Sequence, residues 1–435
     1  MKPMNSKWVL LMGIAMISGM ANAQIDNLVN LSPEWVRTGA RNASTDAPDA
    51  AVYNPAGMTQ LTPGVHISIG NQSLFRNPEH FYNLGFGDGP QSATQDGADW
   101  VLPNLYASFN RANTAFYTGY YLSGGGATAN YSGGSINTDL IALQALMGAQ
   151  GAYGATSQQF FKASSAYHTI IAGASYSFNK TISVGMTARY ITAKNTANAG
   201  LTLSASPYDL PDAPLVLKSE DAASGGGVIA SMMITPGENF KLTLRYESKV
   251  NLDFKTKTIT DDFGVTADGS KSARDLPAAF ATGIEYKFTP RFKMMADYNY
   301  YFQTKADWGT GNVAGEEKEY SAMAGNASMT ALAMEYAVST KMRASIGGTW
   351  SVYNYADKDG YFTQPGAFET LIDDNFSINT GITYSVSKIV DFTFGYMLNV
   401  FKKDTVKALN AYPMDVEVAT QNQMSTVALG LNLNF

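Results

Sequence analysis

From Gly64 to the C-terminus, apolar and polar residues alternate with a period of two, in segments of roughly ten residues, the length that a tilted membrane strand requires. The last segment is the clearest. Its apolar face consists of Val427, Leu429, Leu431, Leu433 and Phe435. Residues 292–303 and 391–400 repeat the alternation. One face therefore suits lipid and the other a lumen, although a half-buried sheet in a soluble protein alternates in the same way.

Short and long connections separate these segments in turn. The short connections, of two to four residues, lie at 110–112, 179–180, 236–238, 289–291, 339–340 and 387–388. The long ones are polar or glycine-rich and lie near 75–100, 123–165, 195–226, 255–277, 305–327, 352–375 and 402–422. Six short turns alternating with seven long loops predict fourteen antiparallel strands with both ends on the short-turn side. We expect a transmembrane β-barrel over residues 63–435, with its short turns in the periplasm.

The N-terminus is typical of an exported protein. Lys2 and Lys7 precede a largely apolar run over residues 8–20, and Ala21-Asn22-Ala23 matches the small-x-small pattern of a signal-peptidase site. The run is too short to span roughly 30 Å of hydrocarbon. Residues 1–23 are therefore predicted to be a signal peptide. Because no later stretch approaches ~18 consecutive apolar residues, any membrane crossing must use a closed barrel.

Residues 24–62 do not alternate and contain many small or polar residues, so we expect short helices and turns that form a hatch inside the barrel. The centre of this hatch is the turn made by Asn54, Pro55, Ala56, Gly57 and Met58. Pro55 fixes its own φ and favours an extended Asn54, and Gly57 permits backbone geometry that a side chain would forbid. The turn is predicted to be rigid and to act as the plug or gate. An ordinary surface turn is the alternative.

Several stretches together resemble the FadL/TodX family of outer-membrane transporters for long-chain fatty acids and other hydrophobic compounds. They are Glu34–Ala43, Asp49–Met58, Gly173–Lys180, Arg245–Val250, Leu276-Pro277, Asp297-Tyr298 and Trp308. The resemblance implies a fourteen-stranded barrel with an N-terminal plug. It also implies that substrate leaves sideways through a gap at a kinked third strand, where Gly119 could supply the kink. The long loops show no such match, so the resemblance does not identify the substrate.

Charge and composition narrow the function further. Without the two lysines of the signal peptide, 28 basic and 36 acidic residues leave a net charge of 28 − 36 = −8. With no basic patch or nucleic-acid motif apparent in the sequence, nucleic acid is not an expected partner. The absence of cysteine fits a protein that crosses an oxidising periplasm, and it excludes disulfides and thiolate metal sites.

The sequence offers little support for catalysis, a cofactor or a metal. Its three histidines, His66, His80 and His168, lack partners at metal-ligand spacing, so structural or solvated roles are expected. The segment Asp357–Gly360 hints at calcium but lacks the spacing of an EF-hand loop, and we interpret it as a turn. The protein is not expected to be an enzyme.

Two sets of residues are candidates for substrate contact. Helical spacing in the 123–165 loop, after a cap at Asn137 or Thr138, predicts an apolar helix. Its apolar residues are Leu140, Ile141, Leu143, Leu146 and Met147. The resemblance implies that such a helix forms an outward groove where substrate first binds, and packing against a neighbouring loop is the alternative.

The second set is a basic row, Lys241, Arg245 and Lys249, which alternates with apolar residues. At least part of it should face the lumen, because charge on the lipid face costs ~2–4 kcal/mol at the midplane. The row could hold a carboxylate headgroup. Glu247 shares this face, however, so a neutralised structural network is the alternative.

We therefore expect a monomeric passive transporter in the outer membrane of a Gram-negative bacterium, surrounded by lipid and lipopolysaccharide. Its ligands would be hydrophobic small molecules, with long-chain fatty acids foremost and aromatics or alkanes also compatible. A general diffusion porin or a structural or adhesive barrel is the competing interpretation. The two differ in whether residues 24–60 fill the lumen.

Overall fold

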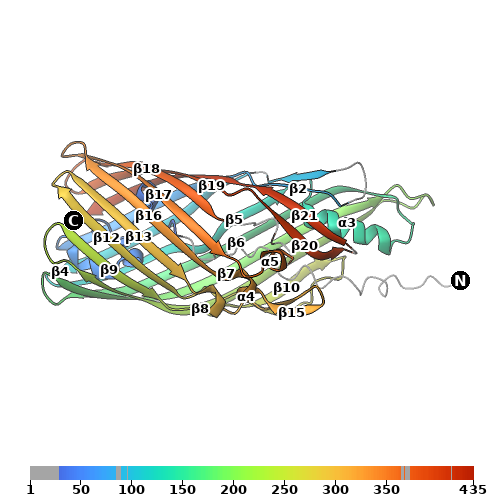
Figure 1. Ribbon diagram of the computed structural model, residues 1–435, viewed down its shortest axis with the longest axis horizontal. Coiled ribbons are helices and arrows are strands. Elements are labelled where there is room, and N and C mark those ends of the chain that lie inside the picture. The colour runs from blue at the N-terminus through green and yellow to red at the C-terminus, as the bar shows by residue number, and fades with distance from the viewer. Residues whose placement is uncertain (1–28, 85–89, 96, 364–366, 368–372, 413) are drawn as a thin grey trace.

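The computed structural model describes residues 29–435 except 85–89, 96, 364–366, 368–372 and 413, so the predicted signal peptide lies outside the described residues. Fourteen strands form one closed antiparallel barrel, as predicted (Figure 1). They are β1 (Gly64–Arg76), β4 (Ala98–Arg111), β5 (Thr114–Tyr131), β6 (Ala155–Ser177), β7 (Ile182–Ser204), β8 (Ala213–Ile234), β9 (Phe240–Glu247), β12 (Ala279–Thr289), β13 (Phe292–Tyr301), β16 (Asn326–Ala337), β17 (Met342–Asn354), β18 (Asn375–Ser385), β19 (Val390–Phe401) and β22 (Gln423–Asn434).

The barrel closes where β1 pairs with β22, in a register that sets Ile69 opposite Leu431. The predicted faces are confirmed. Leu429 is exposed on the outer surface, whereas Ala428 is buried in the lumen. Exposed apolar and aromatic residues recur on every second position around the wall, among them Ile170, Met186 and Phe394. We call this outward-facing apolar surface the apolar belt.

All six predicted short turns lie at one end of the barrel, which we call the turn end, and the long connections lie at the other, the loop end (Figure 1). The predicted loop at 195–226 was wrong. β7 continues to Ser204 and β8 begins at Ala213, so only residues 205–212 connect the two strands. The 123–165 loop is likewise shorter than expected. These strands extend beyond the apolar belt, so their outward residues are polar, and polarity alone was mistaken for a loop.

The loops carry further structure that covers the loop end. β2 (Glu79–Tyr82) and β3 (Gln91–Thr94) join β20 (Asp404–Tyr412) and β21 (Met414–Gln421) in a four-stranded sheet. β10 (Asp253–Asp261) and β11 (Lys271–Ala273) extend the barrel sheet beside β8. The remaining loop elements are α3 (Ile136–Gly148), η4 (Gln303–Lys305), β14 (Thr310–Val313), β15 (Glu316–Glu319), α4 (Tyr320–Ala324) and α5 (Lys358–Phe362).

The described part of the hatch contains α1 (Pro33–Thr38), α2 (Ala50–Tyr53) and the 3-10 helix η3 (Pro55–Gln60), all enclosed by the barrel wall. Ser32 caps α1 by accepting a hydrogen bond from the Trp35 amide, and Gly39 ends it in a left-handed conformation. No helix in the described ranges has the length and apolarity needed to cross a membrane.

Candidate functional site

The hatch is hydrogen-bonded to the wall on one side by neutral residues. The predicted turn forms there: Asn54 Oδ1 accepts from the Gly57 amide at 3.1 Å, which caps η3. Ser175 of β6 donates to the Pro55 carbonyl at 2.5 Å, and Ser231 of β8 accepts from the Ala56 amide at 2.7 Å. Gly185 lies directly behind the turn, where a Cβ atom would be 2.4 Å from the Pro55 carbonyl carbon. The turn is thus seated closely against β6, β7 and β8.

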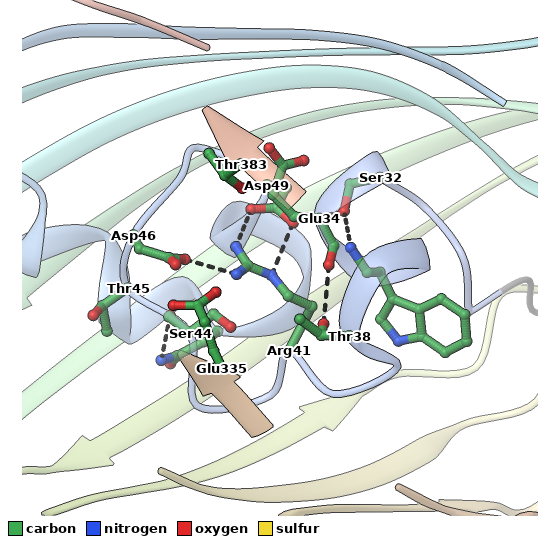
Figure 2. A network of polar contacts seen from close by, with 12 residues as sticks. Ser32, Glu34, Thr38, Arg41, Ser44, Thr45, Asp46, Asp49, Glu335 and Thr383 are labelled. Carbon is green, nitrogen blue, oxygen red and sulfur yellow. Dashed lines mark hydrogen bonds and ion pairs between the residues drawn. The ribbon is translucent and has the colours of Figure 1, made fainter. Parts of the chain in front are cut away.

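The opposite side of the hatch is held by buried charges (Figure 2). The Arg41 guanidinium lies between two hatch carboxylates, with Nη1 2.6 Å from Asp46 Oδ1 and Nη2 2.5 Å from Asp49 Oδ1. Arg37 Nη1 is 2.5 Å from Glu335 Oε2 of β16. Asp46 also pairs with Arg343 of β17 at 3.2 Å. One ionic network therefore joins the hatch to the wall.

The pKa values of these two hatch carboxylates shift in opposite directions. Burial raises the pKa of Asp49 to about 6, although Arg41 opposes the shift. Burial also acts to raise the pKa of Asp46, but Arg41, Lys293 and Arg343 outweigh it and hold that pKa well below its usual range. Asp46 is thus the fixed charge of the network and Asp49 is the titratable one.

Between the hatch and the barrel wall lies a small cavity of about 40 Å³. Most of its lining is apolar or aromatic and comes from the hatch and from wall residues on β5, β8, β13 and β16. Those residues are Val29, Leu31, Trp35, Val52, Tyr53, Tyr121, Ile229, Tyr301 and Met329. This volume is far below the roughly 300–1,000 Å³ of a drug-sized ligand site. A ligand of that size would therefore fit only after the cavity had widened.

Two arginines and one glutamate give the cavity a polar side. Arg189 Nη1 is 2.8 Å from Glu247 Oε2, and Arg245 Nη2 is 3.3 Å from Glu247 Oε1. Two guanidiniums share this carboxylate, so the group carries one excess positive charge. The Nε atoms of both arginines are buried without a hydrogen-bond acceptor. The cavity can therefore accommodate an anionic group beside apolar surface.

The basic row of the sequence analysis is not one site. Arg245 lines the cavity and also donates to the Val52 carbonyl of the hatch at 2.7 Å. Lys241 lies nearer the turn end, where it pairs with Glu285 at 2.9 Å. Lys249 follows β9 and pairs with Asp275 at 2.7 Å. Sequence reasoning missed Arg189, although it shares the inward face of β7 with Thr187 and Ile191, in the same way as Arg245 lies on the inward face of β9.

The predicted apolar helix of the 123–165 loop is α3, and it contacts β6 and β7 at the loop end. The predicted cap was wrong, because Ser135 caps the helix and Thr138 completes a capping box with it. Leu140 is buried in an apolar cluster with Tyr131 and Phe161, and Leu143 and Leu146 are half-buried. Met147 is 56% exposed. The helix thus packs on its neighbours and still presents apolar surface.

The wall has a break beside the cavity. Within the described residues, β5 pairs with β4 only from Thr114 to Tyr120, whereas its pairing with β6 continues to Tyr131. Leu102 of β4 and Leu122 of β5 pack together at the break, and Trp100 is 65% exposed. Asp99, which pairs with Arg76 and accepts from the Thr128 amide, closes the break toward the loop end.

Gly119 lies next to this break. It is paired regularly with Ile171, and the register shifts of β5 fall further along, after Leu122 and after Gly125. A Cβ atom at Gly119 would be 2.6 Å from Cδ1 of Tyr106, whose hydroxyl donates to the Leu31 carbonyl of the hatch at 2.9 Å. Gly119 therefore makes room for a tyrosine that connects β4 to the hatch.

The candidate catalytic and metal residues have structural surroundings. His66 lies between Asn434 Oδ1 and the Thr62 carbonyl, and His168 is 2.7 Å from the Tyr120 hydroxyl. Burial lowers the pKa of His80 to about 4. Asp357 caps α5, so this segment begins a helix and not the predicted turn. In the described part of the chain, no group of three or more histidines or carboxylates is placed to hold a metal ion.

The barrel, the enclosed hatch and the wall break can now be compared with known proteins. No family model and no curated protein sequence matches the chain. Among solved structures, it is similar to a Pseudomonas aeruginosa FadL homologue at 13% identity, with a TM-score of 0.69 over 96% of this chain and 99% of the other. The Pseudomonas putida toluene transporter TodX matches at 12% identity, with a TM-score of 0.63 over 95% of this chain and 100% of the other.

The Ralstonia pickettii toluene transporter TbuX matches at 16% identity, with a TM-score of 0.57 over 94% of this chain and 99% of the other. These similarities cover 94–96% of this chain, which is more than the barrel strands alone, so they extend into the hatch. The chain has the fold of the FadL and TodX transporters, a closed fourteen-stranded barrel with an N-terminal hatch.

Proposed function

We propose that this protein carries hydrophobic molecules passively across the outer membrane of a Gram-negative bacterium. The main observation behind the proposal is that one segment of β5 contributes both to the cavity and to the wall break. Tyr121 and Ser123 line the cavity, while Leu122, between them, packs in the wall break. A ligand in the cavity is thus one residue away from the buried leucine that fills the wall break. The similar structures described as a FadL homologue and toluene transporters support the same function.

The route begins at the loop end. The apolar surface of α3, with Leu140, Leu143, Leu146 and Met147, provides the first contact for a ligand arriving from outside. The ligand then occupies the cavity beside the hatch, which widens as Val29 and Leu31 move. It leaves sideways between Leu102 and Leu122 into the membrane. One chain contains the whole route, so the protein works as a monomer.

Within this class, we favour long-chain fatty acids as the ligand. Arg189 and Arg245 line the apolar cavity and, among the residues that the structure describes, form ion pairs with Glu247 alone, so a carboxylate headgroup would neutralise the excess charge of this group. Lys241 and Lys249 lie outside the cavity lining and pair with other carboxylates, so we assign them structural roles. The porin alternative is disfavoured because the hatch residues from Pro33 to Met58 are almost all buried inside the barrel.

A homologous series of fatty acids, their methyl esters and the parent alkanes tests this assignment. Binding to the purified protein should strengthen with chain length in every series, by up to ~0.8 kcal/mol per buried CH₂. The acids should bind about 1.5–3 kcal/mol more tightly than the esters, because hydrogen bonds to charged groups contribute that much. Arg189→Gln should remove the difference between acid and ester and leave the chain-length dependence unchanged. If short acids bind and esters do not, the site is an anion channel. If nothing apolar binds, the transporter proposal fails.

Crosslinking tests the sideways exit separately. The chain contains no cysteine, so Leu102→Cys/Leu122→Cys can be joined with a short bifunctional reagent. Joining the two strands should stop transfer of bound ligand into surrounding lipid while ligand binding persists. Ala107→Cys/Thr118→Cys is the matched control, because these residues already face each other in the intact part of the β4–β5 ladder. Undiminished transfer in the joined Leu102/Leu122 pair would rule out this exit.

A further inference from the structure

Six exposed lysines gather on the outer surface of the wall where it extends beyond the apolar belt. This lysine patch consists of Lys162 on β6, Lys194 on β7, Lys218 on β8, Lys255 and Lys257 on β10, and Lys271 on β11. Their neighbours along each strand are buried on the inner side, as Ala163, Ala193, Leu217 and Phe254 show. The patch therefore faces away from the cavity and from the transport route.

The strand registers bring these lysines together. Lys194 and Lys255 both pair with Ala222 of β8, from opposite sides, and Lys255 pairs with Lys271. Because neighbouring strands lie about 4.8 Å apart, Lys194 and Lys255 are separated by about 10 Å at their backbones. Lys162 and Lys218 likewise flank Asn198. The sequence shows no basic patch, because the six lysines lie on five different strands and come together only in the folded barrel.

The patch has more positive than negative charge. Lys194 pairs with Glu220 at 3.1 Å, and within the described residues the other five lysines form no ion pair with a carboxylate. Asp253 lies on the same face, and Asp262 and Asp268 lie toward the loop tip. A local excess of lysine is unusual for a chain whose net charge is −6. Lysines left without carboxylate partners on one surface are suited to an anionic ligand.

The patch is continuous with the apolar belt. On β7, Met186 and Tyr190 are 59% and 54% exposed, and Lys194 follows on the same face four residues later, about 13 Å along the strand. Long lysine side chains can reach back toward the belt while keeping the charge in water. A molecule that contacts both surfaces must combine an apolar part with an anionic head directly above it.

We propose that the lysine patch binds the phosphate groups of an outer-leaflet glycolipid of the lipid A type, whose acyl chains lie against the apolar belt below. The inference requires the barrel to be in the outer membrane, but it does not depend on which molecule the protein transports. Bound glycolipid would hold the tall wall of β6, β7 and β8 at a fixed depth in the outer leaflet.

The test uses full-length purified protein in neutral detergent, with hexa-acylated lipid A carrying two phosphates as the probe. Lys194→Gln/Lys255→Gln/Lys257→Gln removes three of the six charges, including the two that flank Ala222. Lys180→Gln/Lys341→Gln/Lys388→Gln removes the same charge from the turn end and is the matched control. Native mass spectrometry gives the bound fraction as a function of lipid concentration. Circular dichroism and thermal unfolding establish that both variants are folded.

The patch variant should bind lipid A on the order of 100-fold more weakly than the wild type, since each lysine near an anionic lipid surface contributes about fivefold. The turn-end variant should bind as the wild type does, and arginine at the three patch positions should retain binding. Lipid A lacking both phosphates should bind as weakly as phosphatidylethanolamine. Equal binding by the patch and turn-end variants would overturn the proposal. Displacement of lipid A by excess inorganic phosphate would also overturn it, because the site would then recognise free phosphate and not a lipid.

Discussion

The hatch makes different kinds of contact with the two sides of the barrel wall. Toward β9, β12, β13, β16 and β17 it is held by charged groups, among them Arg37 with Glu335 and Asp46 with Arg343. Toward β4, β6, β7 and β8 its wall partners are neutral hydroxyl and amide groups, as in Ser175 with Pro55 and Asn110 with Met58. Neutral hydrogen bonds contribute about 0.5–1.5 kcal/mol each, whereas breaking a buried ion pair costs about 3–5 kcal/mol.

For the proposed transport function, this difference suggests how the barrel would open while it retains the hatch. The neutral wall can release the hatch at low cost, and the charged wall keeps it in place. The wall break between β4 and β5 lies on the neutral side, next to the tyrosine contact between Tyr106 and Leu31. We therefore expect the hatch to move first where it meets β4 to β8, with the charged side acting as its anchor.

Removing the central cation of the anchor should have the largest effect. Arg41→Met leaves the buried Asp49 without its guanidinium partner and close to Asp46, which should destabilise the hatch by about 3–5 kcal/mol. Hydrogen exchange across residues 29–61 should accelerate accordingly. Adding Asp49→Asn should recover part of the loss, because one uncompensated charge is removed. A single variant that exchanges like the wild type would show that the charged side is not the anchor.

The pH dependence of the hatch should be the next largest effect. Because burial raises the folded-state pKa of Asp49 from 3.8 to about 6, the folded protein binds a proton that the unfolded chain has released between these values. Stability contributed by Asp49 should therefore fall as pH rises from about 4 to about 6, by up to about 3 kcal/mol, and stay constant above. Asp46, whose pKa is held well below its usual range, should remain ionised throughout.

Hydrogen exchange of the hatch at pH 4.5 and pH 7 checks this slope, once the intrinsic pH dependence of exchange is subtracted. Asp49→Asn should remove most of the slope while leaving the hatch folded. Glu34 lies near Asp49 and contributes to its raised pKa, so Glu34→Gln serves as the second variant and should reduce the slope without removing it. Greater protection at pH 7 than at pH 4.5 in the wild type would contradict the assignment.

The barrel could be predicted from sequence because two independent patterns agreed. The alternation of faces, as in Leu429 and Ala428, located the strands, and the alternation of turn lengths counted them. The loop-end parts of β7 and β8 were not predicted as strands, because the strands extend beyond the apolar belt there. Their outward residues, such as Thr192 and Lys194, are therefore polar. A strand there has the composition of a loop.

The site was less predictable because its contacts connect residues far apart in the chain. Asp297 accepts hydrogen bonds from the amides of Arg41 and Asn42, which are more than 250 positions away. No local sequence pattern predicts a partner at that separation. The Asn54 to Met58 turn could be recognised because Asn-Pro and Gly restrict the local backbone. The ladder break near Leu122 could not, since a strand that loses one neighbour keeps the same alternation.

The smallest effect should come from the neutral wall, and it should be local. Ser175→Ala and Ser231→Ala each remove one hydrogen bond to the hatch turn and should cost about 1 kcal/mol apiece. Exchange should accelerate in residues 51–60 and remain unchanged in 33–41, because the ionic anchor is intact. Ser165→Ala is the matched control, since Ser165 of β6 is also part-buried in the wall but donates to Asn195 of β7 and not to the hatch. If both halves of the hatch accelerate together in the Ser175 and Ser231 variants, the hatch moves as one rigid body, and the distinction between a fixed side and a releasable side is lost.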